Sequence, residues 1–165
     1  MRWYMDTEFN EDGRTIELIS IALVSDDGRE YYAHSADYDV GACNDWVKQN
    51  VLPKVKDLAP KPRSVIRDEI LALIPPESDP EFWAYFADYD WVVFCQLFGR
   101  MIDLPQGYPM FCMDLKQFMQ ARNLRRVDMP NGEPGGEHNA LCDARWVRDC
   151  LHMYDRIAAP AAHPQ

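Results

Sequence analysis

Three apolar segments separated by short polar turns open the chain, and they constrain the fold more than any other feature. Residues 1–9, 15–25 and 29–34 are rich in aromatic and β-branched side chains, which favour strands. Gly13 and Gly28 each follow an aspartate in the two turns, and Asp-Gly pairs are typical of β-hairpins. Strands joined by such short turns pair antiparallel. The sequence therefore predicts an antiparallel meander at the start of a sheet.

The rest of the chain alternates between helical and strand patterns. We expect helices at residues 45–55, 63–74, 87–99, 113–123 and 139–157, and further strands at 81–86 and 109–112. A meander followed by this alternation is typical of an α/β protein with three layers. The sequence thus predicts a central mixed five-stranded sheet flanked by helices, in an arrangement similar to the ribonuclease-H-like fold.

The length of the chain and its cysteines limit the possible organisation of the protein. The 165 residues suit one domain with a sizeable core, which we expect at residues 1–157, with a disordered tail at 158–165. The five cysteines are odd in number and lack zinc-site spacing, which favours reduced, mostly buried thiols in a cytoplasmic protein. We expect no signal peptide, no membrane span and no membrane partner.

The net charge of −10 argues against a surface that coats nucleic acid broadly. Basic residues are nevertheless clustered locally: Arg122, Arg125 and Arg126 form one group, and Arg145 and Arg148 form another. Each group has two interpretations, a solvated helical face or a rim that follows phosphates.

Two acidic residues in the first strand are the strongest functional signal. Asp6 and Glu8 point to the same face, because side chains alternate along a strand. Two carboxylates side by side repel each other unless a cation lies between them, and Mg²⁺ or Mn²⁺ suits such oxygen ligands. The alternative is a strand end that carries two solvated acids.

A second acidic cluster lies near the end of the sequence. Asn139 is a plausible N-cap of the last helix, and His138 and Asp143 flank that helix start. On an ideal helix these two residues would not share a face, since five steps of about 100° place them roughly 140° apart. They converge if His138 lies in the loop before the helix and bends back. The alternatives are a polar loop residue and an exposed helical acid.

The order of these motifs resembles a known superfamily. Asp6 and Glu8, then Asp90 after a strand, then His138 and Asp143 are similar to the motifs of the DEDDh 3′–5′ exonucleases, which have a ribonuclease-H-like fold. The similarity extends over roughly positions 1–155 and is greatest to the polyadenylate-specific 3′–5′ exoribonuclease AS group. The stretches that support this subgroup are residues 6–9, 15–21 and 95–99.

The resemblance implies a function and a chemistry. It implies a 3′–5′ exonuclease that hydrolyses single-stranded RNA and releases nucleoside 5′-monophosphates, with two divalent ions, Mg²⁺ or Mn²⁺. Asp6, Glu8, Asp90 and Asp143 would hold the metals, and His138 would act as general base. It also implies a homodimer. Single-stranded DNA is an alternative substrate, very short RNA another, and a catalytically inactive nucleic-acid-binding module of the same fold is the alternative of a different class.

The middle motif departs from the pattern of many relatives, which have an asparagine a few residues before the aspartate. Either Asp88 or Asp90 can then supply the third acid. We favour Asp90, because it follows an aromatic residue and directly precedes the apolar part of the helix. We interpret Asp88 as a cap of that helix.

The substrate-binding residues are expected beside the acids. Phe9 can stack on a base or pack in the core. The resemblance implies that the Thr7 and Glu8 amides meet the 3′-hydroxyl, and that Glu17 touches sugar, base or a dimer partner. Core packing is favoured over an interface for three tryptophans: Trp46, Trp83 and Trp91.

Overall fold

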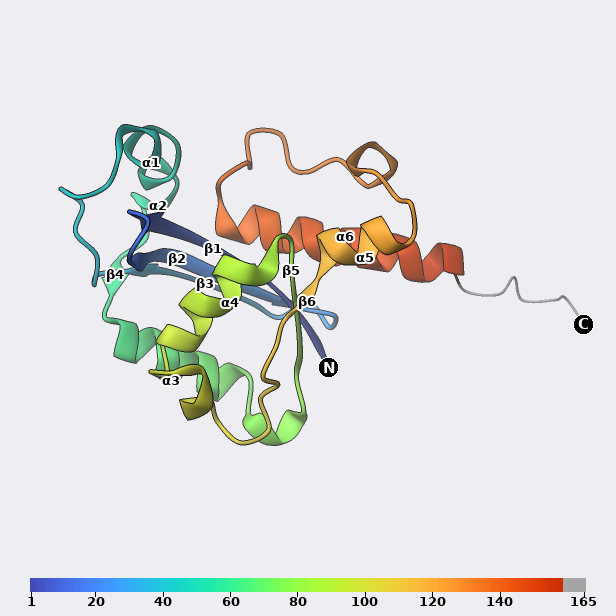
Figure 1. The fold of residues 1–165 in the computed structure, drawn as a ribbon, viewed down its shortest axis with the longest axis horizontal. Helices are drawn as coiled ribbons and strands as arrows, with labels where there is room; N and C mark the ends of the chain where they lie inside the picture. The colour runs from blue at the N-terminus through green and yellow to red at the C-terminus, as the bar shows by residue number, and fades with distance from the viewer. Residues whose placement is uncertain (159–165) are drawn as a thin grey trace, which may run out of the picture.

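The computed structural model describes residues 1–158, which are arranged around one mixed sheet (Figure 1). The strand order is β4-β3-β2-β1-β5-β6. The strands are β1 (Arg2–Glu11), β2 (Ile16–Ser25), β3 (Glu30–Ser35), β4 (Pro60–Lys61), β5 (Glu81–Ala84) and β6 (Met113–Asp114). The first three pair antiparallel, as the hairpin turns predicted, while β5 pairs parallel with β1, and β6 parallel with β5. The strand β1 therefore lies inside the sheet order, with β2 along its length on one side and β5 on the other at Arg2–Tyr4.

Helices cover both faces of this sheet. Within the described residues they are α1 (Asp45–Asn50), α2 (Leu52–Val55), α3 (Arg63–Leu73), α4 (Ala87–Gln96), α5 (Leu115–Ala121) and α6 (Ala140–Ala158). Three short 3₁₀ helices are η1 (Pro76–Ser78), η2 (Met101–Asp103) and η3 (Arg126–Asp128). Figure 1 shows α3 and α4 on one side of the strands and α5 and α6 on the other. The expected α/β class and three-layer arrangement are confirmed.

The period of two along β1 builds a core on each face. Trp3 and Met5 belong to the cluster that includes the apolar residues of α3 and α4. Tyr4, between them in the sequence, packs instead with Trp83 and the apolar side chains of α5 and α6. Each face is thus closed by its own pair of helices, which holds β1 rigidly between two packed layers.

The structure differs from the expected elements in three places. The sheet has six strands where five were expected, because β4 is a two-residue strand, too short for a sequence pattern. The last strand forms at β6, not at residues 109–112. The single helix expected at residues 45–55 is divided into α1 and α2, because Pro53 lacks an N–H and its ring clashes with the preceding helical turn.

Other expectations concern the ends and the thiols. The helix α6 continues to Ala158, and the disordered tail expected at 158–165 otherwise lies outside the described residues. All five cysteines are free, as expected for reduced thiols. In the part of the chain that is described, none of the helices combines the length and apolar character that a bilayer crossing requires.

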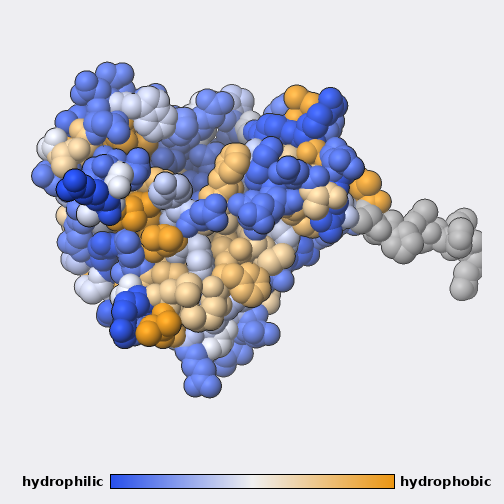
Figure 2. All heavy atoms as spheres, in the orientation of Figure 1, coloured by the Kyte–Doolittle hydropathy of each residue, from blue (hydrophilic) through white to orange (hydrophobic). Residues whose placement is uncertain are grey.

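Hydrophobic residues gather on one face of the molecule. Figure 2 shows them over α4 and the connection from α4 to β6. The large apolar side chains exposed in these segments include Val92, Met101, Ile102, Met110 and Phe111. This surface, called the α4–β6 apolar surface below, lies outside the packed core.

Candidate active site

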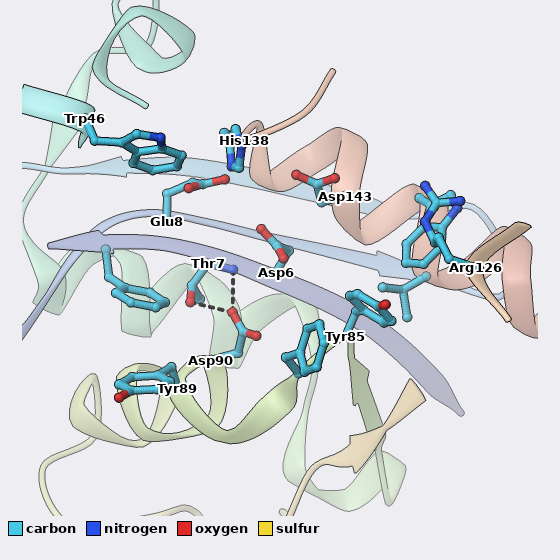
Figure 3. Close-up of a pocket in the computed structure, with 14 residues that line it drawn as sticks. Asp6, Thr7, Glu8, Trp46, Tyr85, Tyr89, Asp90, Arg126, His138 and Asp143 are labelled. Carbon is cyan, nitrogen blue, oxygen red and sulfur yellow. Dashed lines mark hydrogen bonds between the residues drawn. The ribbon is translucent and has the colours of Figure 1, made fainter. Parts of the chain in front are cut away.

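Three carboxylates from opposite ends of the chain meet above the middle of the sheet. Asp6 and Glu8 project from β1, and Asp143 lies in the first turn of α6 (Figure 3). One oxygen of each lies within 4.8 Å of the others. Oxygen ligands of one divalent cation lie about 2.0–2.6 Å from the ion, so this spacing is close to that of a metal site.

A fourth carboxylate comes from the opposite layer. Asp90, in the first turn of α4, is 5% exposed and lines the same cavity as the other three acids. Its Oδ1 atom accepts hydrogen bonds from the Thr7 backbone N–H (2.8 Å) and the Thr7 hydroxyl (2.6 Å). Thr7 thereby ties the start of α4 to the centre of β1.

The structure distinguishes between Asp88 and Asp90, the two candidates for the acid of the middle motif. Asp88 is exposed and does not line the cavity, whereas Asp90 does. The interpretation of Asp88 as a helix cap is wrong. The first N–H of α4, from Ala87, donates instead to Asp114 Oδ2 at 2.8 Å, at the end of β6.

Burial and mutual repulsion make ionisation of the two β1 acids costly. Burial, followed by the charges of Asp90, Glu8 and Asp143, raises the pKa of Asp6 well above its usual value. Burial and the charges of Asp143 and Asp90 raise the pKa of Glu8 to about 8, although the nearby Lys54 ammonium opposes this shift. A divalent cation among these oxygens would remove both penalties, so the residues fit such an ion.

The other two acids are perturbed less, because other groups stabilise their charge. Burial raises the pKa of Asp90 to about 6, and the two hydrogen bonds from Thr7 oppose the rise. Burial also raises the pKa of Asp143, against the effects of His138 and of backbone N–H groups. All four carboxylates therefore hold their protons more tightly than free side chains do.

His138 lies in the turn before α6, as the sequence predicted. Its backbone has φ of 59°, a left-handed conformation that turns the chain back over the helix start. Asn139 caps the helix, accepting hydrogen bonds from Leu141 N (3.1 Å) and Cys142 N (3.3 Å). The His138 side chain lines the cavity together with Asp143, so the five residues of the motif border one space.

The ring of His138 packs edge-on against Trp46 of α1, with ring centroids 4.7 Å apart. Core packing, the use favoured for three tryptophans, is confirmed for Trp83 and Trp91, which are buried. It is wrong for Trp46, which is 51% exposed and forms part of the cavity wall. The pairing of Trp46 with His138 carries no local sequence signal.

The cavity has a volume of about 460 Å³ and is largely aromatic. Phe9 lines it and stacks on Tyr89, with centroids 5.5 Å apart. Besides Trp46, six residues that line it were not assigned to the site from sequence: Tyr85, Phe86, Tyr89, Arg126, Trp146 and Val147. The aromatic residues among them flank Asp90 or follow Asp143, and that proximity is the signal that identifies them.

Two of the expected substrate residues are placed differently from expectation. The Thr7 amide, expected at a 3′-hydroxyl, donates its hydrogen to Asp90. Glu17 lies on β2 opposite Asn10 and does not line the cavity.

A mixed sheet with two acids on β1 and one acid each from α4 and α6 is consistent with the ribonuclease-H-like class of metal-dependent nucleases. Comparison with known proteins narrows this class. The chain belongs to the Rv2179c-like 3′–5′ exoribonuclease domain family, whose sequence model matches residues 1–154. It is similar to two Mycobacterium tuberculosis proteins, the 3′–5′ exoribonuclease Rv2179c of strain ATCC 25618 / H37Rv and the 3′–5′ exoribonuclease MT2234.1 of strain CDC 1551 / Oshkosh. Each is 44% identical over 151 residues, which cover 88% of this chain and 88% of the relative.

Proposed function

We propose that this protein is a divalent-metal-dependent 3′–5′ exoribonuclease that removes nucleoside 5′-monophosphates from single-stranded RNA. The observation that carries the proposal is the approach of the Asp6, Glu8 and Asp143 oxygens to within 4.8 Å, in a chain of an exoribonuclease family. Residues 1–157 would form one domain, and the protein would act in the cytoplasm. Within the superfamily, the polyadenylate-specific AS group remains the subgroup that we favour.

The four acids have the oxygen-only chemistry that suits Mg²⁺ or Mn²⁺. Asp6, Glu8 and Asp143 would hold one ion, and Asp6 with Asp90 would hold a second. Such a pair of ions, when bound, activates a water molecule and stabilises the leaving oxygen of a phosphodiester. Thr7 supports this arrangement, because its two hydrogen bonds to Oδ1 of Asp90 fix the carboxylate and leave Oδ2 for the site.

His138 is placed to accept a proton from the attacking water. It borders the cavity beside Asp143, and histidine is the side chain that most often serves as a general base. Gly135 and Gly136 precede it, and Gly135 has a φ of 72° that suits glycine. We propose that this turn lets His138 close over bound RNA and that Trp46 limits its approach from the α1 side.

The terminal nucleoside would occupy the aromatic part of the cavity. A volume of about 460 Å³ is within the range of small-molecule sites. Phe9, supported by Tyr89, offers a ring on which the terminal base can stack. Because successive N–H groups of a strand point to opposite sides, the Glu8 amide points toward β2 and is not the expected contact for the 3′-hydroxyl, while Thr7 would act through Asp90. Glu17 lies outside this cavity and is not proposed as a contact of the substrate.

The decisive experiment is hydrolysis of 5′-labelled single-stranded RNA and DNA oligonucleotides with Mn²⁺, with Asp6→Asn as control. We expect a ladder of single-nucleotide steps from the 3′ side of RNA, slower loss of DNA, and no product with the variant or with EDTA. Undiminished hydrolysis after thorough chelation would overturn the metal-dependent mechanism. Faster degradation of DNA would favour the alternative substrate, and no hydrolysis of either would favour a binding module.

We also propose that two copies of the chain associate through the α4–β6 apolar surface. Exposed apolar side chains that gather on one face are typical of protein interfaces. Light scattering should give twice the mass of one chain, and Phe111→Asp should shift this toward the monomer. Val127→Asp, at an exposed apolar residue elsewhere, is the matched control. A monomer at all concentrations would contradict the proposal.

A further inference from the structure

The arginines near the cavity differ in what their charge contacts. Arg125 is paired with Asp128 at 3.2 Å, and Arg145 with Glu30 at 2.6 Å. Arg126, between them in the sequence, has no carboxylate within salt-bridge distance among residues 1–158. It is also the arginine that lines the same cavity as the four acids. Its charge is therefore available to a ligand in that cavity.

Aromatic and backbone contacts hold the Arg126 guanidinium in place. Its central carbon lies 4.0 Å from the ring centroid of Trp146, a cation–π contact with a buried side chain. Arg126 Nη1 donates to the Pro130 carbonyl at 3.2 Å, and Trp146 Nε1 donates to the same oxygen at 2.9 Å. Tyr85 packs edge-on against Trp146, with centroids 5.0 Å apart. One of five guanidinium N–H groups is thus used inside the protein, and the side chain is oriented before any ligand binds.

The position of Arg126 relative to the acids limits what it can bind. Figure 3 shows Trp46 and Arg126 at opposite ends of the cavity, with Asp6 and Asp143 between them. An exonuclease places the scissile phosphodiester at the acids. The nucleoside on its 3′ side carries no further phosphate, because it is the end of the chain. Any second phosphate in the site therefore belongs to the strand on the 5′ side.

We propose that Arg126 binds the RNA phosphodiester immediately 5′ of the scissile one. This inference rests on the function proposed above. A guanidinium donates two parallel hydrogen bonds to a phosphate, and its charge offsets the repulsion between RNA and an acidic protein of net charge −10. Tyr85, which is half-buried beside Trp146, is the aromatic ring that suits the penultimate nucleotide, because the face of Trp146 is covered by Arg126. The enzyme thereby distinguishes a trinucleotide from a dinucleotide, which lacks the second phosphodiester.

The test compares the trinucleotide ApApA with the dinucleotide ApA. For Arg126→Ala we expect kcat/KM on ApApA to fall about tenfold or more, as for loss of a hydrogen bond to a charged group, and the fall on ApA to be several-fold smaller. Arg126→Lys should retain part of the activity on ApApA, because it keeps the charge without the paired donors. Arg125→Ala, one residue away and already paired with Asp128, is the control that should leave both substrates unchanged.

A neutral methylphosphonate at the 5′ linkage of ApApA identifies the contacted group. It should slow the wild-type protein as Arg126→Ala does, and it should have little further effect on that variant. Equal losses on ApA and ApApA would place Arg126 at the scissile phosphate and overturn the proposal, as would unchanged kinetics on ApApA.

The proposal is separable from the proposed function by a binding measurement. In a His138→Ala background, titration of ApApA followed by calorimetry should show affinity about tenfold weaker when Arg126 is also replaced by alanine. If the wild-type protein hydrolyses no RNA but this difference is present, the exonuclease assignment fails and the phosphate site stands. If hydrolysis is present and the difference is absent, the phosphate site fails alone.

Discussion

Thr7 and Asp90 are joined by two hydrogen bonds to a single oxygen, from the backbone N–H and from the hydroxyl of one residue. The contact links β1, which carries two of the acids, to α4, which carries a third. It also opposes the rise that burial causes in the pKa of Asp90.

Thr7→Val should test this link, because valine keeps the shape and the amide but removes the hydroxyl. We expect kcat to fall about tenfold and the Mn²⁺ concentration for half-maximal activity to rise, as is usual for residues that orient metal ligands. Thr15→Val removes an exposed hydroxyl bonded to Asp12 and is the matched control. Unaltered metal dependence in Thr7→Val would show that the amide alone positions Asp90.

The neighbouring acids Asp88 and Asp90 offer a paired comparison on one helix. Asp90→Asn should reduce activity on the order of 100-fold or more, because it removes the charge of a buried carboxylate that we propose as a metal ligand. Asp88→Asn should retain near wild-type rates, because that side chain is exposed and outside the cavity. Steady-state kinetics of the two variants at saturating Mn²⁺ test this. A large loss in Asp88→Asn with little loss in Asp90→Asn would make Asp88 the third acid.

His138→Ala should lose on the order of 10²–10⁴-fold in turnover, the usual contribution of a general base. Metal affinity and thermal stability should be retained, because His138 is assigned to proton transfer and lies exposed in a turn. Calorimetric titration with Mn²⁺ measures the metal affinity, and thermal unfolding measures the stability. A loss of metal affinity equal to that of Asp6→Asn would make His138 a ligand.

Metal binding should stabilise the protein more at pH 8 than at pH 6. Between its ordinary pKa near 4.5 and its folded-state pKa of about 8, Glu8 binds more proton in the folded than in the unfolded protein. The free energy of unfolding of the metal-free protein therefore falls as pH rises through this window, and the raised pKa of Asp6 acts in the same direction. Bound Mg²⁺ removes this loss by stabilising the ionised carboxylates.

Thermal unfolding in EDTA and in Mg²⁺ at the two pH values measures this difference. Glu8→Gln should reduce the dependence of the Mg²⁺ effect on pH, whereas Glu17→Gln on β2, outside the cavity, should leave it intact. An equal Mg²⁺-induced rise in Tm at pH 6 and pH 8 in the wild-type protein would contradict the prediction.

Single-stranded RNA should be degraded faster than a blunt duplex, and a blocked 3′ end should stop the reaction. The cavity accepts an unstacked end, whereas a duplex end must first fray at a cost of a few kcal/mol. Time courses on matched single-stranded, duplex and 3′-phosphorylated RNA test this. Cleavage of a circular RNA at a similar rate would indicate an endonuclease.

The parts of the site that follow from local periodicity could be predicted. Asp6 and Glu8 share a face because a strand has a period of two, and Asn139 marks where α6 begins. His138 was expected in the preceding loop because a helix would have turned it away from Asp143. Each of these features depends on the residues next to it in the sequence and on the order of the motifs.

The parts that depend on tertiary contact could not be predicted. Trp46 meets His138 only because α1 packs against Ile19 of β2. The face of Trp146 is covered by Arg126 from another segment. The Thr7 amide looked available for substrate because its acceptor, Asp90, is distant in sequence. The two-residue strand β4 has too few side chains for any pattern.

The sheet ends on its two shortest strands, β4 and β6, each of two residues. A long exposed edge invites further chains to add by backbone pairing, and short edge strands are one way in which proteins prevent such aggregation. Strand β2 has a strand on each side, and β1 does so at Arg2–Tyr4. Beyond Tyr4 the second edge of β1 faces α4, where the Thr7 N–H donates to Asp90 and not to a further strand. The helix that supplies Asp90 to the site thus also shields the open edge of the strand that carries Asp6 and Glu8 from pairing with another chain.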